Sequence, residues 1–164
     1  MATKRSVVDY RRKREQKTNY HQRRRQLSST KPRLDIRRYA NSIMMQIIAF
    51  EPKGDKVLCA YTSTKLKKEY GWSGHTGNIC AAYLTGLAIA KNSEAKDVHA
   101  DFGFQRSVKG STIYAAIKGA IDGGIQVVCD KKMFPKQEQL DGKFLKRGND
   151  IIAKIKEQIM DAKK

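Results

Sequence analysis

The run of residues 43–50, IMMQIIAF, most constrains the fold of this chain. In a β-strand, successive side chains point to opposite faces of the sheet. Both faces of this strand would be largely apolar: Ile43, Met45, Ile47 and Ala49 on one, and Met44, Ile48 and Phe50 on the other. A strand that is apolar on both sides needs a layer packed against each face of its sheet. We therefore predict an α/β domain with three layers, α/β/α.

Shorter patterns predict the remaining elements of this domain. Alternating residues predict strands over 33–38 and 98–104, a hairpin turn at 52–55 predicts a returning strand over 57–62, and a short apolar run predicts a strand over 125–129. Apolar spacings of three to four predict helices over 76–91 and 149–162, and a helix over 111–122 is predicted from the cap at Ser111 and the stop at Gly123-Gly124. Residues 65–72 are typical of an exposed helical turn, and residues 130–148 predict a basic, irregular connection. An antiparallel meander followed by two right-handed crossovers gives a mixed sheet.

A basic arm, predicted over residues 1–32, precedes a globular domain over residues 33–164. Residues 1–33 carry 12 of the 34 Lys and Arg residues but 2 of the 16 Asp and Glu residues, so they hold more than half of the net charge of +18. The arm has few apolar residues, and Pro32 favours an extended residue before it. We expect the arm to be disordered or partly helical alone, and ordered on a partner.

The composition of the arm indicates a nucleic-acid partner. Two blocks of basic residues flank Thr18–Gln22, whose side chains can stack or form hydrogen bonds. A solvated tail is the plainer interpretation, and a membrane-surface helix would need an apolar stripe, which residues 10–25 lack. The predicted RNA contacts are Arg11, Arg12, Lys13, Arg14, Lys17, Thr18, Tyr20, His21, Arg23, Arg24, Arg25, Lys31, Arg33, Arg37 and Arg38.

Secondary RNA contacts are predicted at Trp72, His75, Asn78, Lys109, Lys131 and Lys132. Each has a plainer alternative. Trp72 is favoured as a packing residue, and Lys109 could simply precede an ordinary capped helix instead of holding a phosphate at its start. The basic residues after 130 could contact RNA or a neighbouring protein, or belong to a solvated loop.

Several motifs resemble those of one family, the large-subunit ribosomal proteins that bind 5S rRNA, numbered eighteen in bacteria and five in eukaryotes. The matching motifs run from the arm to the last third of the chain: Arg11-Arg12, Tyr20-His21-Gln22-Arg23, Lys31-Pro32-Arg33-Leu34, Tyr70-Gly71-Trp72, Thr76-Gly77-Asn78, Ala82-Tyr83-Leu84-Thr85-Gly86-Leu87, Lys118-Gly119-Ala120, Asp122-Gly123-Gly124 and Phe134-Pro135. The length and the arm are similar to those of archaeal members.

The resemblance implies a ribonuclease-H-like fold and a structural, non-enzymatic role. It implies that the arm and the nearby sheet hold 5S rRNA, with some contact to 23S rRNA, and that the protein sits in the central protuberance beside neighbouring ribosomal proteins. The sequence departs from the family at Val127-Val128-Cys129, where members have Ile-Pro-His. Any contact made by that histidine is therefore in doubt here.

Enzymatic and metal-binding alternatives have little support in the sequence. A ribonuclease-H-like nuclease needs several carboxylates around two metal ions, and nothing in the sequence brings Asp35, Asp101 and Asp130 together. The three Cys and three His residues lack zinc-ligand spacing, so we expect no metal and no cofactor. Three widely spaced Cys residues favour a reducing, cytosolic setting, and no signal peptide or membrane span is predicted.

Overall fold

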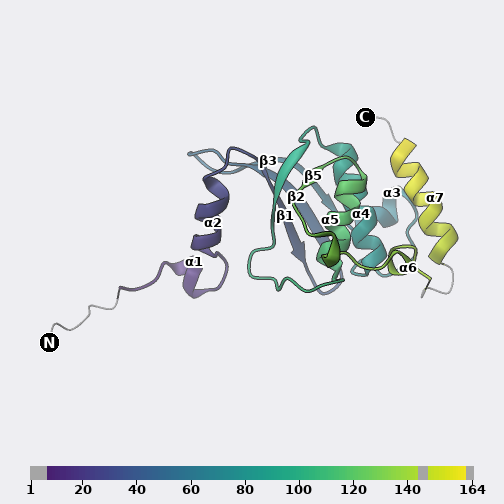
Figure 1. The fold of residues 1–164 in the computed structure, drawn as a ribbon, viewed down its shortest axis with the longest axis horizontal. Coiled ribbons are helices and arrows are strands. Elements are labelled where there is room, and N and C mark those ends of the chain that lie inside the picture. Colours follow the sequence, from purple (N-terminus) through teal and green to yellow (C-terminus); the bar gives the residue numbers. More distant parts are fainter. Residues whose placement is uncertain (1–6, 144–147, 162–164) are drawn as a thin grey trace.

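A five-stranded sheet with the order β3–β2–β1–β4–β5 forms the centre of the computed structural model, which describes residues 7–143 and 148–161 (Figure 1). The strands are β1 (Arg33–Arg38), β2 (Ile43–Ala49), β3 (Lys56–Thr62), β4 (Asp97–Asp101) and β5 (Gln126–Val127). β1, β2 and β3 are antiparallel neighbours, whereas β4 runs parallel to β1 and β5 runs parallel to β4. The predicted mixed sheet is confirmed.

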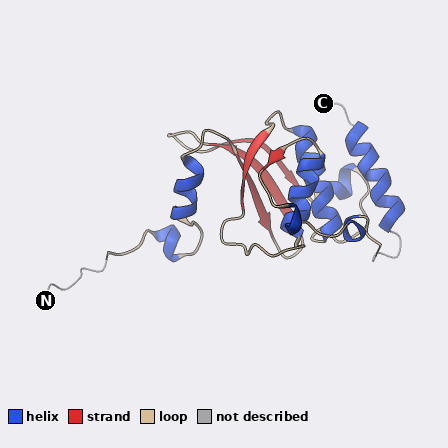
Figure 2. Cartoon of the chain, viewed as in Figure 1, coloured by secondary structure: helices blue, strands red, loops and turns tan. Residues whose placement is uncertain are grey.

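Helices lie on both sides of this sheet (Figures 1 and 2). On one side are α1 (Arg11–Arg14) and α2 (Tyr20–Leu27); on the other are α3 (Lys65–Glu69), α4 (Ile79–Asn92), α5 (Thr112–Asp122), α6 (Gln137–Leu140) and α7 (Gly148–Asp161). α4 and α5 pack against each other, and α7 packs on α4. The three-layer α/β/α architecture is confirmed. None of the described helices is long and apolar enough to cross a membrane.

The two faces of β2 are covered very differently. Ile43, Met45 and Ile47 belong to the hydrophobic core and are at most 1% exposed. Met44 and Ile48 point to the other face and are only partly buried. The prediction that the strand is buried on both faces was therefore wrong for the face that carries Met44 and Ile48. The physical reason is that α2 is rich in arginine and glutamine and has no apolar stripe with which to seal it.

Two glycines set the distance between α4 and α5. A Cβ atom at Gly86 would lie 2.1 Å from the carbonyl oxygen of Ala116, and one at Gly119 would lie 2.0 Å from that of Tyr83. No real Cβ approaches an oxygen so closely, so the two backbones are in direct contact at these points. The small residues that the sequence places on the 76–91 segment serve this close packing.

Several element boundaries differ from the prediction. α4 begins at Ile79 instead of residue 76, because the Asn78 side chain accepts a hydrogen bond from the backbone N–H of Ala81 at 2.7 Å and caps the helix. β4 ends at Asp101, whose side chain bonds the N–H of Gly103, a residue with φ of +57°. This turn stops the strand before residue 104.

The predicted irregular connection over residues 130–148 contains two short helices, so that prediction was wrong in part. A 3₁₀ helix, η1 (Lys131–Met133), follows Asp130, and α6 follows Lys136. The final helix, α7, spans Gly148–Asp161, and it therefore begins one residue before the predicted start at 149. Residues 1–6 of the predicted arm, residues 144–147 and residues 162–164 lie outside the described residues.

Candidate nucleic-acid interface

The second half of the predicted arm is a helix held against the sheet. Asn19 starts α2 by accepting a hydrogen bond from the backbone N–H of Gln22 at 3.2 Å. Near the other end of α2, the Gln26 side-chain amide donates to the carbonyl oxygen of Ala100 on β4 at 3.3 Å. The next turn is fixed by a 2.9 Å hydrogen bond between Ser29 and His99. These contacts set the orientation of the arm residues relative to the sheet.

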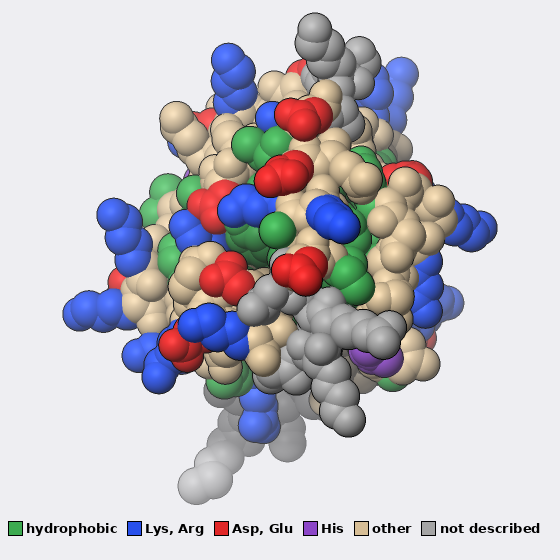
Figure 3. All heavy atoms as spheres, turned by 90° about the vertical axis from the view of Figure 1, so that its right-hand side faces the viewer, with side chains coloured by type: hydrophobic (Ala, Val, Ile, Leu, Met, Phe, Trp, Pro, Cys, Tyr) green, Lys and Arg blue, Asp and Glu red, His purple; other side chains and the backbone are tan. Residues whose placement is uncertain are grey.

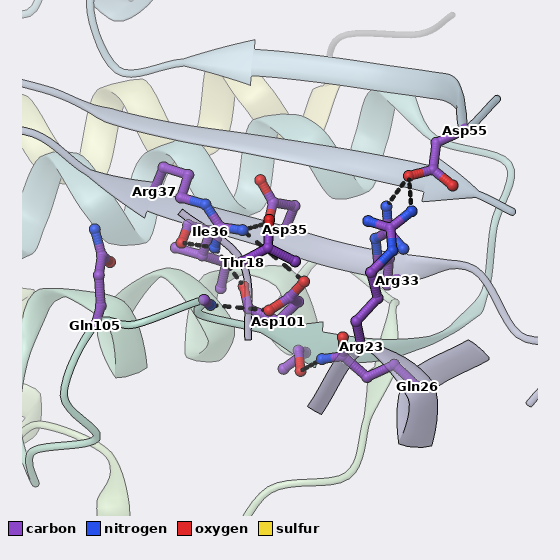
Figure 4. Close-up of polar contacts among 12 residues, drawn as sticks. Thr18, Arg23, Gln26, Arg33, Asp35, Ile36, Arg37, Asp55, Asp101 and Gln105 are labelled. Carbon is purple, nitrogen blue, oxygen red and sulfur yellow. Dashed lines mark hydrogen bonds and ion pairs between the residues drawn. The ribbon is translucent and has the colours of Figure 1, made fainter. Parts of the chain in front are cut away.

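Asp55, in the turn between β2 and β3, joins the arm to the sheet. One carboxylate oxygen of Asp55 accepts from Arg23 of α2 at 2.8 Å and from Arg33 of β1 at 2.5 Å (Figure 4). Burial by itself would raise the pKa of Asp55, but the hydrogen bonds from both guanidinium groups outweigh it and hold the pKa below its ordinary value. Arg33 is only 7% exposed, so in this arrangement it supports the interface from beneath.

Arg37 lies between two carboxylates on neighbouring strands. Asp35 of β1 and Asp101 of β4 are partners in the parallel pairing, and the Arg37 guanidinium is 2.5 Å from the first and 3.9 Å from the second (Figure 4). Burial, which outweighs the attraction of Arg37, raises the pKa of Asp35 to about 6, and the nearby charge of Asp101 adds to the rise. The cluster is thus an ion-paired network with a poorly solvated carboxyl group.

The structure brings Asp35 and Asp101 together, which the sequence did not lead us to expect. It does not assemble a metal site from them. Asp130 instead accepts the backbone N–H of Lys132 at 2.9 Å and caps η1. Within the described residues, no group of three or more His, Cys, Asp or Glu side chains is placed to hold a metal ion. The guanidinium of Arg37 pairs with Asp35 and lies near Asp101, so a cation of the chain already contacts the carboxylate pair.

A cleft of about 370 Å³ separates the arm from the open sheet face. The arm wall carries Arg12, Lys17 and Thr18, and the sheet wall carries Arg37 and Tyr39. Tyr39 is 52% exposed. Exposed arginine and aromatic groups on facing walls suit a ligand with phosphates and flat rings.

The predicted RNA contacts divide according to their charge partners. Arg11, Lys13, Lys17 and Lys31 form exposed ion pairs with Glu15, Asp9, Glu15 and Asp97, respectively. Exposed ion pairs of this kind contribute little to stability. Five of the predicted arginines have no carboxylate within ion-pairing distance in the described part of the chain: Arg12, Arg14, Arg24, Arg25 and Arg38. These five charges are available to a polyanion.

Aromatic side chains accompany these charges. The rings of Tyr10 and Tyr20 lie 5.4 Å apart, and their side chains are 74% and 37% exposed. His21 is exposed beside Tyr20 on α2. The opposite end of the molecule is different: seen from the α7 side, acidic and basic side chains alternate (Figure 3). The structure therefore gathers unpaired arginines with exposed rings at the arm end.

Three of the predicted secondary contacts have structural roles. Trp72 is 3% exposed, and its indole N–H donates to the carbonyl oxygen of His75 at 3.4 Å, which favours the packing alternative. The His75 ring contacts Asn41 at 3.3 Å, and Asn78 caps α4. The remaining three, Lys109, Lys131 and Lys132, are exposed.

The two carboxyl groups of the interface predict opposite effects of pH. Because the folded-state pKa of Asp35 is raised, its contribution to stability is complete below its ordinary pKa and is lost as pH rises through about 6. The difference in melting temperature, Asp35→Asn minus the unmodified protein, should therefore become more positive as the pH is raised from about 4 to about 7. Thermal unfolding followed by circular dichroism at several pH values measures this difference.

Asp55→Asn is the matched control for this measurement. The lowered pKa of Asp55 means that its contribution is present above the ordinary pKa and is lost as pH falls. The variant should be less stable than the unmodified protein at neutral pH, and the difference should shrink in acid. If both variants showed the same pH trend, the assigned burial and pairing of these carboxyl groups would be wrong.

A family model described as "Ribosomal large subunit proteins 60S L5, and 50S L18" matches residues 4–99. The matched range covers more than half of the chain and includes the arm, β1 to β3 and α4. α5, β5 and α7 lie beyond it, as do the motifs around Gly119 and Phe134. The match therefore covers most of the residues that line the cleft, with Asp101 and Gly103 just beyond it.

Proposed function

Because this chain belongs to the family of large-subunit ribosomal proteins 60S L5 and 50S L18, we propose that it helps attach 5S rRNA to 23S rRNA in the central protuberance. Family membership makes the chain a structural, non-enzymatic component of the large ribosomal subunit that binds 5S rRNA. The finer proposal is that the arm and the open sheet face hold 5S rRNA, while outer arm residues reach 23S rRNA and neighbouring ribosomal proteins.

The unpaired arginines at the arm end carry this proposal. Arg12 and Arg14 come from the first basic block and Arg24 and Arg25 from the second, and α2 holds the second block on the sheet. Such charges neutralise phosphates and fix orientation. Tyr10, Tyr20 and Tyr39 are exposed, and RNA is read mainly at unpaired bases that can stack on aromatic rings.

A nuclease is the alternative that the fold class raises, and the site argues against it. Catalytic carboxylates in such enzymes bind metal ions directly. In this protein, the carboxylates of Asp35 and Asp101 both face the guanidinium of Arg37. A guanidinium of the chain itself thus occupies the position between the two strand carboxylates.

Binding to a 5S rRNA transcript, measured over a range of salt concentrations with tRNA as competitor, tests the proposal. We expect tight binding that persists in excess tRNA, because the cleft presents its charges and rings in a fixed arrangement. The logarithm of the binding constant should fall with the logarithm of salt concentration by roughly 0.7 to 0.9 per phosphate contact. Equal competition by tRNA would show that the isolated protein supplies charge without specificity.

A further inference from the structure

A second hollow lies beside α2, with a volume of about 650 Å³. That is within the range of roughly 300–1,000 Å³ found for small-ligand sites. Its walls come from α2, β4, α5 and the segment after β5. Gln22 and Gln26 line both the cleft and the hollow, whereas Arg23 lines only the cleft and Arg25 only the hollow. An RNA bound along α2 would therefore pass the mouths of both.

Aromatic and aliphatic groups form one part of this hollow. The rings of Phe102 and Tyr114 lie 5.9 Å apart at 68°. The Tyr114 hydroxyl is hydrogen-bonded to Ser107, which fixes the position of the ring. Val128 lines the same hollow and is 88% exposed. A flat, apolar ligand face could pack against Phe102 and Val128 in this part of the hollow.

Polar groups with unused hydrogen-bonding capacity form the other part. Gln26 donates its amide to the carbonyl oxygen of Ala100, which leaves its side-chain oxygen as an acceptor. One ring nitrogen of His99 bonds Ser29, and the second can still donate or accept. The Gln22 side chain has no hydrogen bond among the described residues. All three side chains line the hollow, so a ligand with donors and acceptors finds hydrogen-bonding groups in its wall.

Positive charge borders the hollow. Arg25 is exposed and has no carboxylate partner in the residues that the structure describes, and Lys131 and Lys132 follow the hollow-lining Asp130. Asp130 itself is engaged with the backbone N–H of Lys132. A ligand that carries a phosphate on one or both sides would place its negative charges next to these basic side chains.

We propose that this hollow receives one unstacked nucleobase of the bound rRNA. A nucleobase combines a flat stacking face, a polar edge and flanking phosphates, which are the features that these walls, amides and arginine can bind. An apolar side chain of a neighbouring protein would use Phe102 and Val128 but would leave the amides and Arg25 unmatched. The inference rests on the proposed function and identifies the RNA feature that this part of the interface recognises.

Phe102→Leu tests the inference, because it removes the aromatic face and keeps an apolar side chain. If a base stacks on this ring, the Kd for the 5S rRNA transcript should rise about 10-fold, with an unchanged salt dependence, because no phosphate contact is removed. Phe104→Leu is the matched control: Phe104 is 51% exposed, lies two residues away and does not line the hollow. Its Kd should equal that of the unmodified protein.

A measurement on the unmodified protein removes any dependence on how the variant folds. Ultraviolet crosslinking of the complex, followed by mass spectrometry, should attach a nucleotide to Phe102 or Cys129. If Phe102→Leu binds like Phe104→Leu and no crosslink falls on these residues, the hollow does not hold a base and the inference is overturned. If the unmodified protein fails to bind the transcript at all, the proposed function itself fails.

Discussion

Replacing Arg11, Arg12, Arg14, Arg24 and Arg25 together by alanine should weaken binding to 5S rRNA by about 1,000-fold or more near physiological salt. All five side chains are exposed, and only Arg11 has a carboxylate partner among the described residues, the exposed Glu15 at 3.2 Å. The salt slope should fall by roughly 0.7 to 0.9 for every phosphate that the variant no longer neutralises. Filter binding or fluorescence anisotropy at several salt concentrations measures both quantities.

Arg23 is deliberately kept in this variant. It pairs with Asp55, so its removal would weaken the attachment of α2 to the sheet, and the effect of lost charge could not be separated from the effect of altered structure. A control with the same change in net charge replaces five exposed lysines elsewhere by alanine: Lys56, Lys67, Lys68, Lys96 and Lys154. The control should retain most of the affinity. An equal weakening in both proteins would mean that net charge, and not the placement of the arginines, determines binding.

Gly86→Ala and Gly119→Ala should each destabilise the domain by about 3 kcal/mol or more, because the new methyl group would overlap a backbone carbonyl of the facing helix. For a protein of this size, that corresponds to a fall in melting temperature of about 6–12 °C. Neither substitution can be accommodated by a rotamer change, since the nearest atoms belong to the backbone of Ala116 and Tyr83. Thermal and urea unfolding of each variant measure the effect.

Gly110→Ala separates steric overlap from ordinary backbone strain. Gly110 has φ of +71°, and a Cβ atom there would have no neighbour within 4 Å. Its cost should come from the left-handed conformation alone, about 1–2 kcal/mol. If Gly86→Ala proved no more destabilising than Gly110→Ala, α4 and α5 would have to move apart at little cost, contrary to their direct backbone contact.

The sequence predicted the sheet well because strand patterns are local. Alternating residues located β1 and β4, a hairpin turn located β3, and the run that is apolar on both faces located β2 and required a layer on each side of the sheet. Element ends were less accurate, since a cap such as Asn78 or a turn such as Asp101–Gly103 depends on one hydrogen bond. β5 is reduced to two residues, which an apolar run of five residues did not indicate.

The candidate site was predicted less completely than the fold. Basic blocks and interleaved tyrosines are visible in the sequence, but the residues that hold them are not. Asp55 is 32 residues from Arg23 in the chain, and Asp35 is 66 residues from Asp101. Arg33 and Arg37, two of the predicted RNA contacts, are paired with these carboxylates within the protein. No signal short of the sheet register could have shown this.

The sequence alone thus determined the fold class, the basic arm and the family to which the chain belongs, because composition, periodicity and motifs are properties of neighbouring residues. Only the tertiary structure decided which charges are paired within the protein and which are exposed without a carboxylate partner among the described residues. It also decided that α2 lies on the sheet, with a cleft and a hollow beside it. The physical reason is that ion pairs and cavities depend on distances between residues far apart in the chain, which strand order and register set.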